Sequence, residues 1–299
     1  MSSRILSTSH GTHRAAFGPV EWALFLGVGI TWGASFLFID VGLEAFSPGM
    51  VTLIRVGLGA ATLALFPSSR RPIDRSDWPR LLVVSVLWVA VPLSLFPIAQ
   101  QWIDSAVAGM LNGTMPMLTA LIAAVMLSEM PAGRQIAGLV VGFGGVVCIS
   151  LPTIGEGTSA ALGVGLVVLA IVCYALAVNI VAPLQQRYGS LPVLSRALAV
   201  ATVLVLPRGL TTLPTSVPDW TPIGAMLALG IVGTGLAFIA MGTLVGRAGA
   251  TRASMITYVI PVVALVLGVA VLNDHVTPLQ VGGCGLVVIG AILASRREV

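Results

Sequence analysis

Apolar residues follow one another in long runs that are separated by short polar connectors. A helix needs about 20 apolar residues to cross the hydrocarbon core of a bilayer, with a range of about 17 to 25. Ten runs approach or reach this length, and each predicts a transmembrane helix. The runs are residues 20–39, 49–66, 80–99, 105–126 and 135–151, followed by 161–183, 191–206, 222–243, 250–272 and 278–295. The weakest run, 191–206, is short and contains Arg196.

The composition excludes a water-soluble fold. Of 299 residues, 57% are hydrophobic and 9% are charged, whereas a soluble domain carries about 25% charged residues. Lipid must therefore surround most outward-facing side chains. The net charge of +4 comes from Arg in the connectors, which favours membrane topology over a nucleic-acid partner. Residues 1–19 lack the features of a cleaved signal peptide, so we expect a tail followed by a retained first helix.

The Arg residues also predict an orientation. All 15 basic residues are Arg, and cytoplasmic connectors are enriched in basic residues. With the N-terminus inside, twelve Arg lie in cytoplasmic segments and only Arg208 lies in an outer connector. We therefore expect a multi-pass protein of a bacterial-type inner membrane, with both termini in the cytoplasm.

An internal repeat relates the two halves of the chain. Shifting the sequence by 145 positions lays residues 106–150 over 251–295 without a gap, pairing Pro116 with Pro261 and Glu129 with Asp274. Each half holds five runs, an odd number, so the second half should enter the membrane with opposite polarity. The predicted fold is an all-α membrane protein of ten transmembrane helices, arranged as two inverted five-helix repeats over 20–151 and 152–299. Such repeats place a binding site near the midplane between the halves.

The repeated segments, PMLTALIAAVMLSEMPAGRQIAGLVVGFGGV and PVVALVLGVAVLNDHVTPLQVGGCGLVVIGA, together with WGASFLF in the first run, resemble the paired EamA modules of the drug/metabolite transporter superfamily. The resemblance covers nearly the whole chain and implies a ten-helix exporter with inverted halves. Within the superfamily the chain looks most like the YddG-type exporters of aromatic and other apolar amino acids. The second turn departs from the family, because it reads Asn-Asp-His where Gly-Glu is usual, so no role of the family's acidic residue is carried over to Asp274.

Aromatic and polar residues inside the runs are the candidate substrate contacts. Polar groups at membrane depth face a cavity or a neighbouring helix, and interhelical hydrogen bonding is the alternative to cavity lining. Aromatic residues also serve as packing or interface anchors. The candidates are Trp32, Ser35, Phe36, Trp88, Phe96, Asn112, Met115, Tyr174, Asn179, Phe238, Met241, Thr257 and Tyr258.

Two further pairs of residues carry alternatives. Pro116 and Pro261 each remove a helix hydrogen bond, so they predict either a hinge in each half or a static bend. Arg55 and Arg196 lie inside their runs. Each either extends to the headgroups, binds a substrate carboxylate or latches a closed state.

Several absences narrow the function. No Asp or Glu falls near the middle of a run, and HExxH and GxSxG are missing, so an enzyme, a metal site and a cofactor are not expected. The three Cys residues lie in apolar runs and should be buried and unpaired. The expected partners are a small-molecule substrate and the bilayer, with no obligate protein partner. The leading hypothesis is alternating-access export of small amphipathic metabolites such as amino acids, and the alternative is efflux of lipophilic cations.

Overall fold

The computed structural model describes residues 18–127, 133–211, 213 and 218–295, and within these ranges every regular element is helical. Among the described residues, eight helical segments are long and apolar enough to cross a membrane, and two shorter apolar helices span Pro48–Ala64 and Pro278–Ala294. Helix therefore covers most of each of the ten predicted runs, with residues 65–66 and 113–114 as non-helical exceptions. The run 191–206 is part of the longer helix Ser190–Leu210.

The bounds of the elements are as follows. The first half contains α1 (Pro19–Leu43), α2 (Pro48–Ala64), η1 (Pro67–Arg70), η2 (Arg75–Asp77), α3 (Trp78–Val84), η3 (Ser85–Ala90), α4 (Val91–Ala99), α5 (Ser105–Asn112), α6 (Met115–Leu127) and α7 (Gly133–Gly155). The second half contains α8 (Thr158–Tyr188), α9 (Ser190–Leu210), α10 (Trp220–Leu227), η4 (Ala228–Leu236), α11 (Ala237–Ala248), α12 (Ala250–Ala253), η5 (Ser254–Tyr258), α13 (Val259–Leu267), η6 (Gly268–Leu272) and α14 (Pro278–Ser295).

Several of these segments change helical form along their length. Both η3 and η4 are π-helices. The shift of 145 that aligns the repeats carries 85–90 onto 230–235, inside η4. The prolines show a second correspondence. Helix α5 ends at Asn112, just before Pro116, and the 3-10 helix η5 ends at Tyr258, just before Pro261. Helix irregularities thus recur at equivalent places in the two halves.

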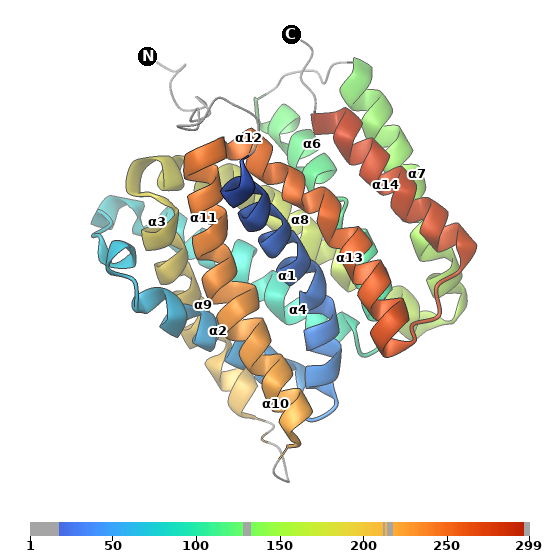
Figure 1. Ribbon diagram of the computed structural model, residues 1–299, viewed down its shortest axis with the longest axis horizontal. Coiled ribbons are helices and arrows are strands. Elements are labelled where there is room, and N and C mark those ends of the chain that lie inside the picture. The colour runs from blue at the N-terminus through green and yellow to red at the C-terminus, as the bar shows by residue number, and fades with distance from the viewer. Residues whose placement is uncertain (1–17, 128–132, 212, 214–217, 296–299) are drawn as a thin grey trace.

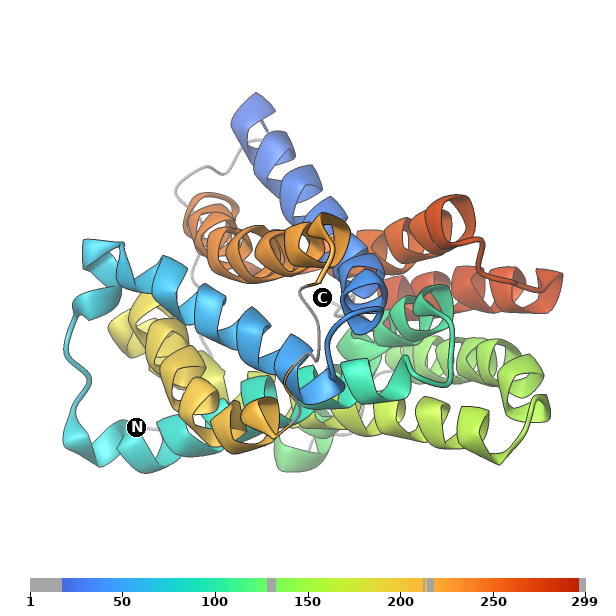
Figure 2. The ribbon, with the colours of Figure 1, turned by 90° about the horizontal axis from the view of Figure 1, so that it is seen from below.

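The helices α7 and α14 pack directly against each other at one side of the molecule (Figures 1 and 2). A methyl group on Gly138 would lie 2.7 Å from the carbonyl oxygen of Gly290, and one on Gly290 would lie 2.6 Å from that of Gly138. The same reciprocity joins Gly145 and Gly283, at 2.6 and 2.8 Å. These glycines are required because the two backbones leave no room for a side chain.

Two glycines form the sharp corners between consecutive helices. Gly189 separates α8 from α9 with a φ of 84°, and Gly249 separates α11 from α12 with a φ of 87°. Each donates its N–H to a carbonyl of the preceding helix, Gln185 and Val245 respectively, at 2.9 Å. Because L side chains rarely adopt positive φ, glycine lets each helix turn back at once.

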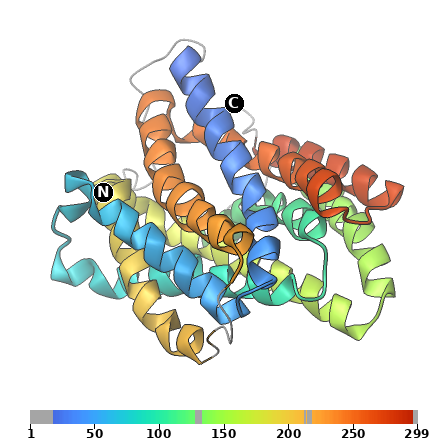
Figure 3. The same cartoon turned by 60° about the horizontal axis from the view of Figure 1, so that its bottom comes forward.

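The core has a large central cluster and a second cluster between α2, α3, α8 and α9. Figure 3 shows the ribbons of these four helices close to one another. Tyr174 packs against both clusters. Cys173 and Cys284 are buried, as predicted, but Cys148 is only half-buried, which corrects that expectation. The reason is that Cys148 lies on α7, a helix at the edge of the bundle whose outer face is exposed. Glu129 and most of the N-terminal tail lie outside the described residues.

Candidate functional site

Two tryptophan rings from distant parts of the chain meet the ring of Phe238 on α11. The ring of Trp32 on α1 lies 5.8 Å from that of Phe238, and the ring of Trp88 on η3 lies 6.3 Å from it, both edge to face. Trp88 sits on a π-helix, a form that is frequent at functional sites. The sequence candidates from three separate segments therefore come together.

A second group of three rings is connected to the first through α1. Phe36 of α1 packs edge to face on Phe96 of α4 at 5.4 Å, and Phe96 stacks on Tyr174 of α8 at 6.1 Å. Trp32 and Phe36 lie one turn apart, on one face of α1. The aromatic cluster, as we name it, consists of Trp32, Phe36, Trp88, Phe96, Tyr174 and Phe238.

Three polar candidates lie on helices around the aromatic cluster. The Ser35 hydroxyl donates to the Thr31 carbonyl at 3.1 Å, and a methyl on Gly233 of η4 would lie 3.3 Å from it. The Asn179 amide donates to the carbonyl of Ala175 at 2.8 Å and to that of Thr119 on α6 at 3.5 Å. The side-chain oxygen of Asn112 is buried and has no hydrogen-bond partner among the described residues. An unpaired buried amide oxygen is costly, so it is available to a ligand donor.

The remaining four candidates make other contacts. Met115 and Met241 pack on the margin of the central cluster. The Thr257 hydroxyl donates to the Ser254 carbonyl at 2.7 Å. The Tyr258 hydroxyl donates to the Ala291 carbonyl of α14 at 3.1 Å, and its ring packs on a small satellite cluster with Ala291. Because this cluster lies along α14, the contacts of Tyr258 are with the scaffold. Its substrate role stays a prediction.

Arg55 and Thr234 complete the polar surroundings. Arg55 is the eighth of 17 residues in α2 and is 9% exposed, and its Nε–H donates to Thr234 Oγ1 on η4 at 3.3 Å. The bond holds Arg55 at mid-helix, so it is not directed to the headgroups. Thr234 was not among the sequence candidates, because a lone Thr in an apolar run carries no signal of its partner.

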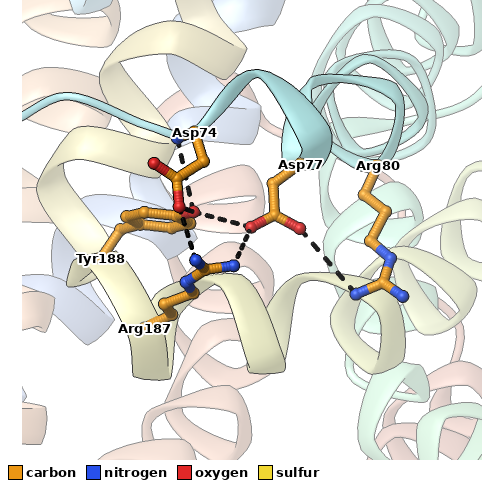
Figure 4. A network of polar contacts seen from close by, with 5 residues as sticks. All are labelled: Asp74, Asp77, Arg80, Arg187 and Tyr188. Atoms are coloured by element: carbon orange, nitrogen blue, oxygen red, sulfur yellow. Dashed lines mark hydrogen bonds and ion pairs between the residues drawn. The ribbon is translucent and has the colours of Figure 1, made fainter.

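An ionic network joins the connector before α3 to the end of α8 (Figure 4). The guanidinium of Arg187 pairs with both Asp74 and Asp77, at 2.8 Å for Asp77 Oδ2. The Tyr188 hydroxyl donates to the same oxygen of Asp77 at 2.7 Å. The acids belong to the first half and their partners to the second, so the network ties the two halves together.

Two further sets of polar contacts link the halves, one at the start of α1 and one at the connector that follows α2. Arg247 at the end of α11 pairs with Glu21 of α1 at 2.6 Å, and Figure 1 shows these helix ends side by side. Arg196 of α9 donates to the carbonyl of Ser69 at 2.8 Å and to that of Arg70 at 3.3 Å. These bonds hold Arg196 against the connector that follows α2. Arg196 therefore anchors that connector.

Asp274 forms a polar link between α5 and the loop after η6. Its carboxylate accepts hydrogen bonds from Ser105 Oγ at 3.0 Å and from the Ala106 backbone N–H at 2.9 Å. It therefore caps α5 from the opposite half, where a carboxylate is favoured by the helix dipole. Burial raises the pKa of the adjacent Asp104, and the charge of Asp274 adds to this effect.

Asp274→Ala should lower the free energy of unfolding by about 1 kcal/mol, the typical loss when a helix cap is removed. The reason is that the N–H of Ala106 and the hydroxyl of Ser105 lose their acceptor. Heat unfolding in detergent measures the effect, with the neighbouring His275→Ala as control. Equal stability of the two variants would contradict the capping role.

Comparison with known proteins agrees with this architecture. The chain is 28% identical to a probable terminal-alkyne amino-acid exporter of Streptantibioticus cattleyicolor, over 92% of this chain and 93% of that one. It is 25% identical to a probable amino-acid metabolite efflux pump of Escherichia coli, over 90% and 93%. It is 24% identical to an uncharacterized transporter of Archaeoglobus fulgidus, over 89% and 95%.

The fold and the family also match. A solved crystal structure superposes with a TM-score of 0.64 at 19% identity, covering 92% of this chain and 96% of that one, which shows a shared fold. The model of the EamA-like transporter family matches twice, at residues 21–151 and 161–296. The chain is therefore a multi-pass membrane protein that belongs to the EamA-like transporter family.

Proposed function

We propose that this transporter exports small amphipathic metabolites, above all amino acids with aromatic or apolar side chains, by alternating access. The observation that carries the proposal is the aromatic cluster, which is assembled from α1, η3 and α4 of one half and α8 and α11 of the other. A site shared by two halves changes its access when one half moves against the other. The two relatives named as an amino-acid exporter and an amino-acid metabolite efflux pump support this substrate class.

The proposal includes ten transmembrane helices in two inverted repeats. The α7–α14 contact supports it, because a two-fold axis makes each contact between the repeats occur twice. If one residue of the first repeat meets a residue of the second, the equivalents of these two residues must meet as well. Adding 145 to Gly138 gives Gly283, and adding 145 to Gly145 gives Gly290. Gly138 meets Gly290 and Gly145 meets Gly283, so the contact is reciprocal. Inversion places both termini on one side, which we assign to the cytoplasm of a bacterial-type inner membrane.

The interrupted helices support a binding site near mid-depth. Helices broken at corresponding places in two halves are a feature of transporter binding sites. Here α5 ends at Asn112 before Pro116, and η5 ends at Tyr258 before Pro261. Because proline lacks an N–H, the carbonyls four residues earlier, those of Asn112 and Thr257, lose their usual donor. These two prolines are our proposed hinges.

We assign the closed end of the transporter to the end of the bundle that carries the ionic contacts between the halves. Arg187 with Asp74 and Asp77, and Arg247 with Glu21, all join one half to the other. We propose that opening towards the termini requires these pairs to separate. A transporter of this kind must break and re-form such contacts in each cycle. The Arg187–Asp74 pair is exposed on both sides, and exposed ion pairs are of modest strength.

Arg187→Gln should loosen this end of the bundle by about 1 kcal/mol or less, since an exposed ion pair contributes about 0.2–1 kcal/mol. Hydrogen–deuterium exchange of peptides covering residues 66–78 measures the change, and their deuterium uptake should rise. Arg80→Gln is the matched control, because Arg80 is 4.0 Å from Asp77 and largely exposed. Equal deuterium uptake in both variants would exclude the Arg187 network as a closing contact.

Counterflow in proteoliposomes tests the transport function. Vesicles loaded with unlabelled L-phenylalanine should accumulate labelled L-phenylalanine transiently, and vesicles without protein should not. Exchange of a lipophilic cation such as tetraphenylphosphonium, with no amino-acid exchange from folded protein, would overturn the amino-acid proposal in favour of cation efflux.

A further inference from the structure

Arg55 is a cation inside the bundle that has no counter-ion among the described residues. It lies at the middle of α2 and is 9% exposed. Among the described residues no carboxylate lies within 4.0 Å of its guanidinium. A charge at the centre of a membrane helix costs about 3 kcal/mol on insertion scales, and removing one partner of a buried pair leaves an uncompensated charge. The described residues therefore leave the charge of Arg55 uncompensated.

The hydrogen bonds of Arg55 leave its terminal nitrogens available. A guanidinium has five N–H donors, and among the described residues only the Nε–H of Arg55 has a partner, Thr234 Oγ1. The Thr234 hydroxyl in turn donates to the Leu229 carbonyl at 2.9 Å, which orients its oxygen as an acceptor. The threonine thus fixes one edge of the guanidinium. The two terminal NH₂ groups, the pair that binds a carboxylate at two points, keep their donors free.

Arg55 also lies beside the aromatic cluster. The next residue, Val56, belongs to the second core cluster, and the rings of Trp88, Tyr174 and Phe238 pack against that cluster. Thr234, which holds Arg55, follows Gly233, and Gly233 faces Ser35 on α1. A ligand with its apolar part on the rings can therefore present a polar head to Arg55.

We propose that Arg55 binds the carboxylate of the substrate while the aromatic cluster binds its apolar part. The inference rests on the proposed function and narrows it to molecules that carry a carboxylate. It also gives a physical reason against lipophilic cations, since a second positive charge beside Arg55 is repelled in a low-dielectric site. The substrate would supply the counter-ion that the described residues lack.

The test compares L-phenylalanine with L-phenylalaninamide, which keeps the ring and the amine but has no carboxylate. In counterflow, the wild type should prefer the acid by about 30-fold or more, the factor that corresponds to the loss of one buried charge pair. Arg55→Gln should raise the KM for L-phenylalanine by a similar factor and abolish the preference. Arg208→Gln, which removes an exposed Arg at the end of α9, is the control and should keep it.

Heat unfolding of the ligand-free proteins separates binding from folding. Arg55→Gln should unfold at or above the wild-type temperature, because it removes an uncompensated charge. L-phenylalanine should raise the unfolding temperature of the wild type and not that of the variant. Lower stability of Arg55→Gln, with acid and amide weakened alike, would assign Arg55 a structural role and overturn the inference.

The remaining outcomes distinguish the inference from the function on which it rests. Amino-acid exchange by the wild type without preference for the acid over the amide would overturn the role of Arg55 and leave the exporter proposal intact. No exchange of either compound by folded wild type would overturn both. The wild-type preference needs no variant, so this comparison decides the inference even where Arg55→Gln fails to fold.

Discussion

Gly138→Ala should lower the free energy of unfolding by about 3 kcal/mol, at the upper end of the usual cost of overpacking a core. The added methyl would lie 2.5 Å from the backbone nitrogen of Ala294 and 2.7 Å from the carbonyl oxygen of Gly290. Both are backbone atoms of α14, so no side-chain rotation relieves the contact and the helices must separate. The midpoint of heat unfolding in detergent measures the loss.

Neighbouring glycines provide the controls for this prediction. A methyl on Gly144 of α7 or on Gly285 of α14 meets nothing within 4 Å, so Gly144→Ala and Gly285→Ala should unfold at the wild-type temperature or above it. Gly290→Ala should behave like Gly138→Ala, because the contact is reciprocal. A Gly138→Ala variant as stable as Gly144→Ala would show that α7 and α14 are not packed as closely as described.

Trp32→Ala should reduce amino-acid exchange at least about tenfold, which corresponds to about 1.4 kcal/mol of lost binding. Trp32 supplies an edge-to-face contact to Phe238, and an aromatic substrate would lose both a ring contact and the position of the neighbouring ring. Counterflow at several substrate concentrations, with the amount of folded protein normalised, gives the change in KM and in maximal rate.

The control for Trp32 is another tryptophan. Trp220 begins α10 and is 86% exposed, so Trp220→Ala removes the same side chain away from the cluster and should leave exchange within about twofold of wild type, as expected for an exposed anchor. Equal exchange by Trp32→Ala and Trp220→Ala would remove the aromatic cluster from the substrate site.

The helical elements could be predicted from the sequence because lipid imposes a simple rule on every span. A backbone in the bilayer core has no water to bind and must form its own hydrogen bonds. Long apolar runs therefore fold as helix, including the run that contains Arg196. The ends were less predictable. Helix α9 continues to Leu210 and α8 to Tyr188, beyond the apolar runs, because their last turns bind connectors and neighbouring helices.

The site could be predicted only in part. The aromatic candidates could be named because large rings inside apolar runs are conspicuous, and six of them form two groups of ring contacts in the structure. Their partners could not be predicted, since Trp32 and Phe238 are distant in the sequence. The acceptor of Arg55 and the cap formed by Asp274 depend on tertiary packing. For Arg55 the sequence left three alternatives open: extension to the headgroups, binding of a substrate carboxylate and a latch on a closed state.

The most direct measurement of the central claim, alternating access between the two halves, is the labelling of a cysteine at Ser35 in a protein lacking Cys148, Cys173 and Cys284. Ser35 is 3% exposed and faces Gly233 of the opposite half. In vesicles of known orientation, a membrane-impermeant thiol reagent should modify Ser35→Cys slowly from either side, and L-phenylalanine should change both rates. Labelling from neither side, or from one side only in every condition, would contradict alternating access at this site.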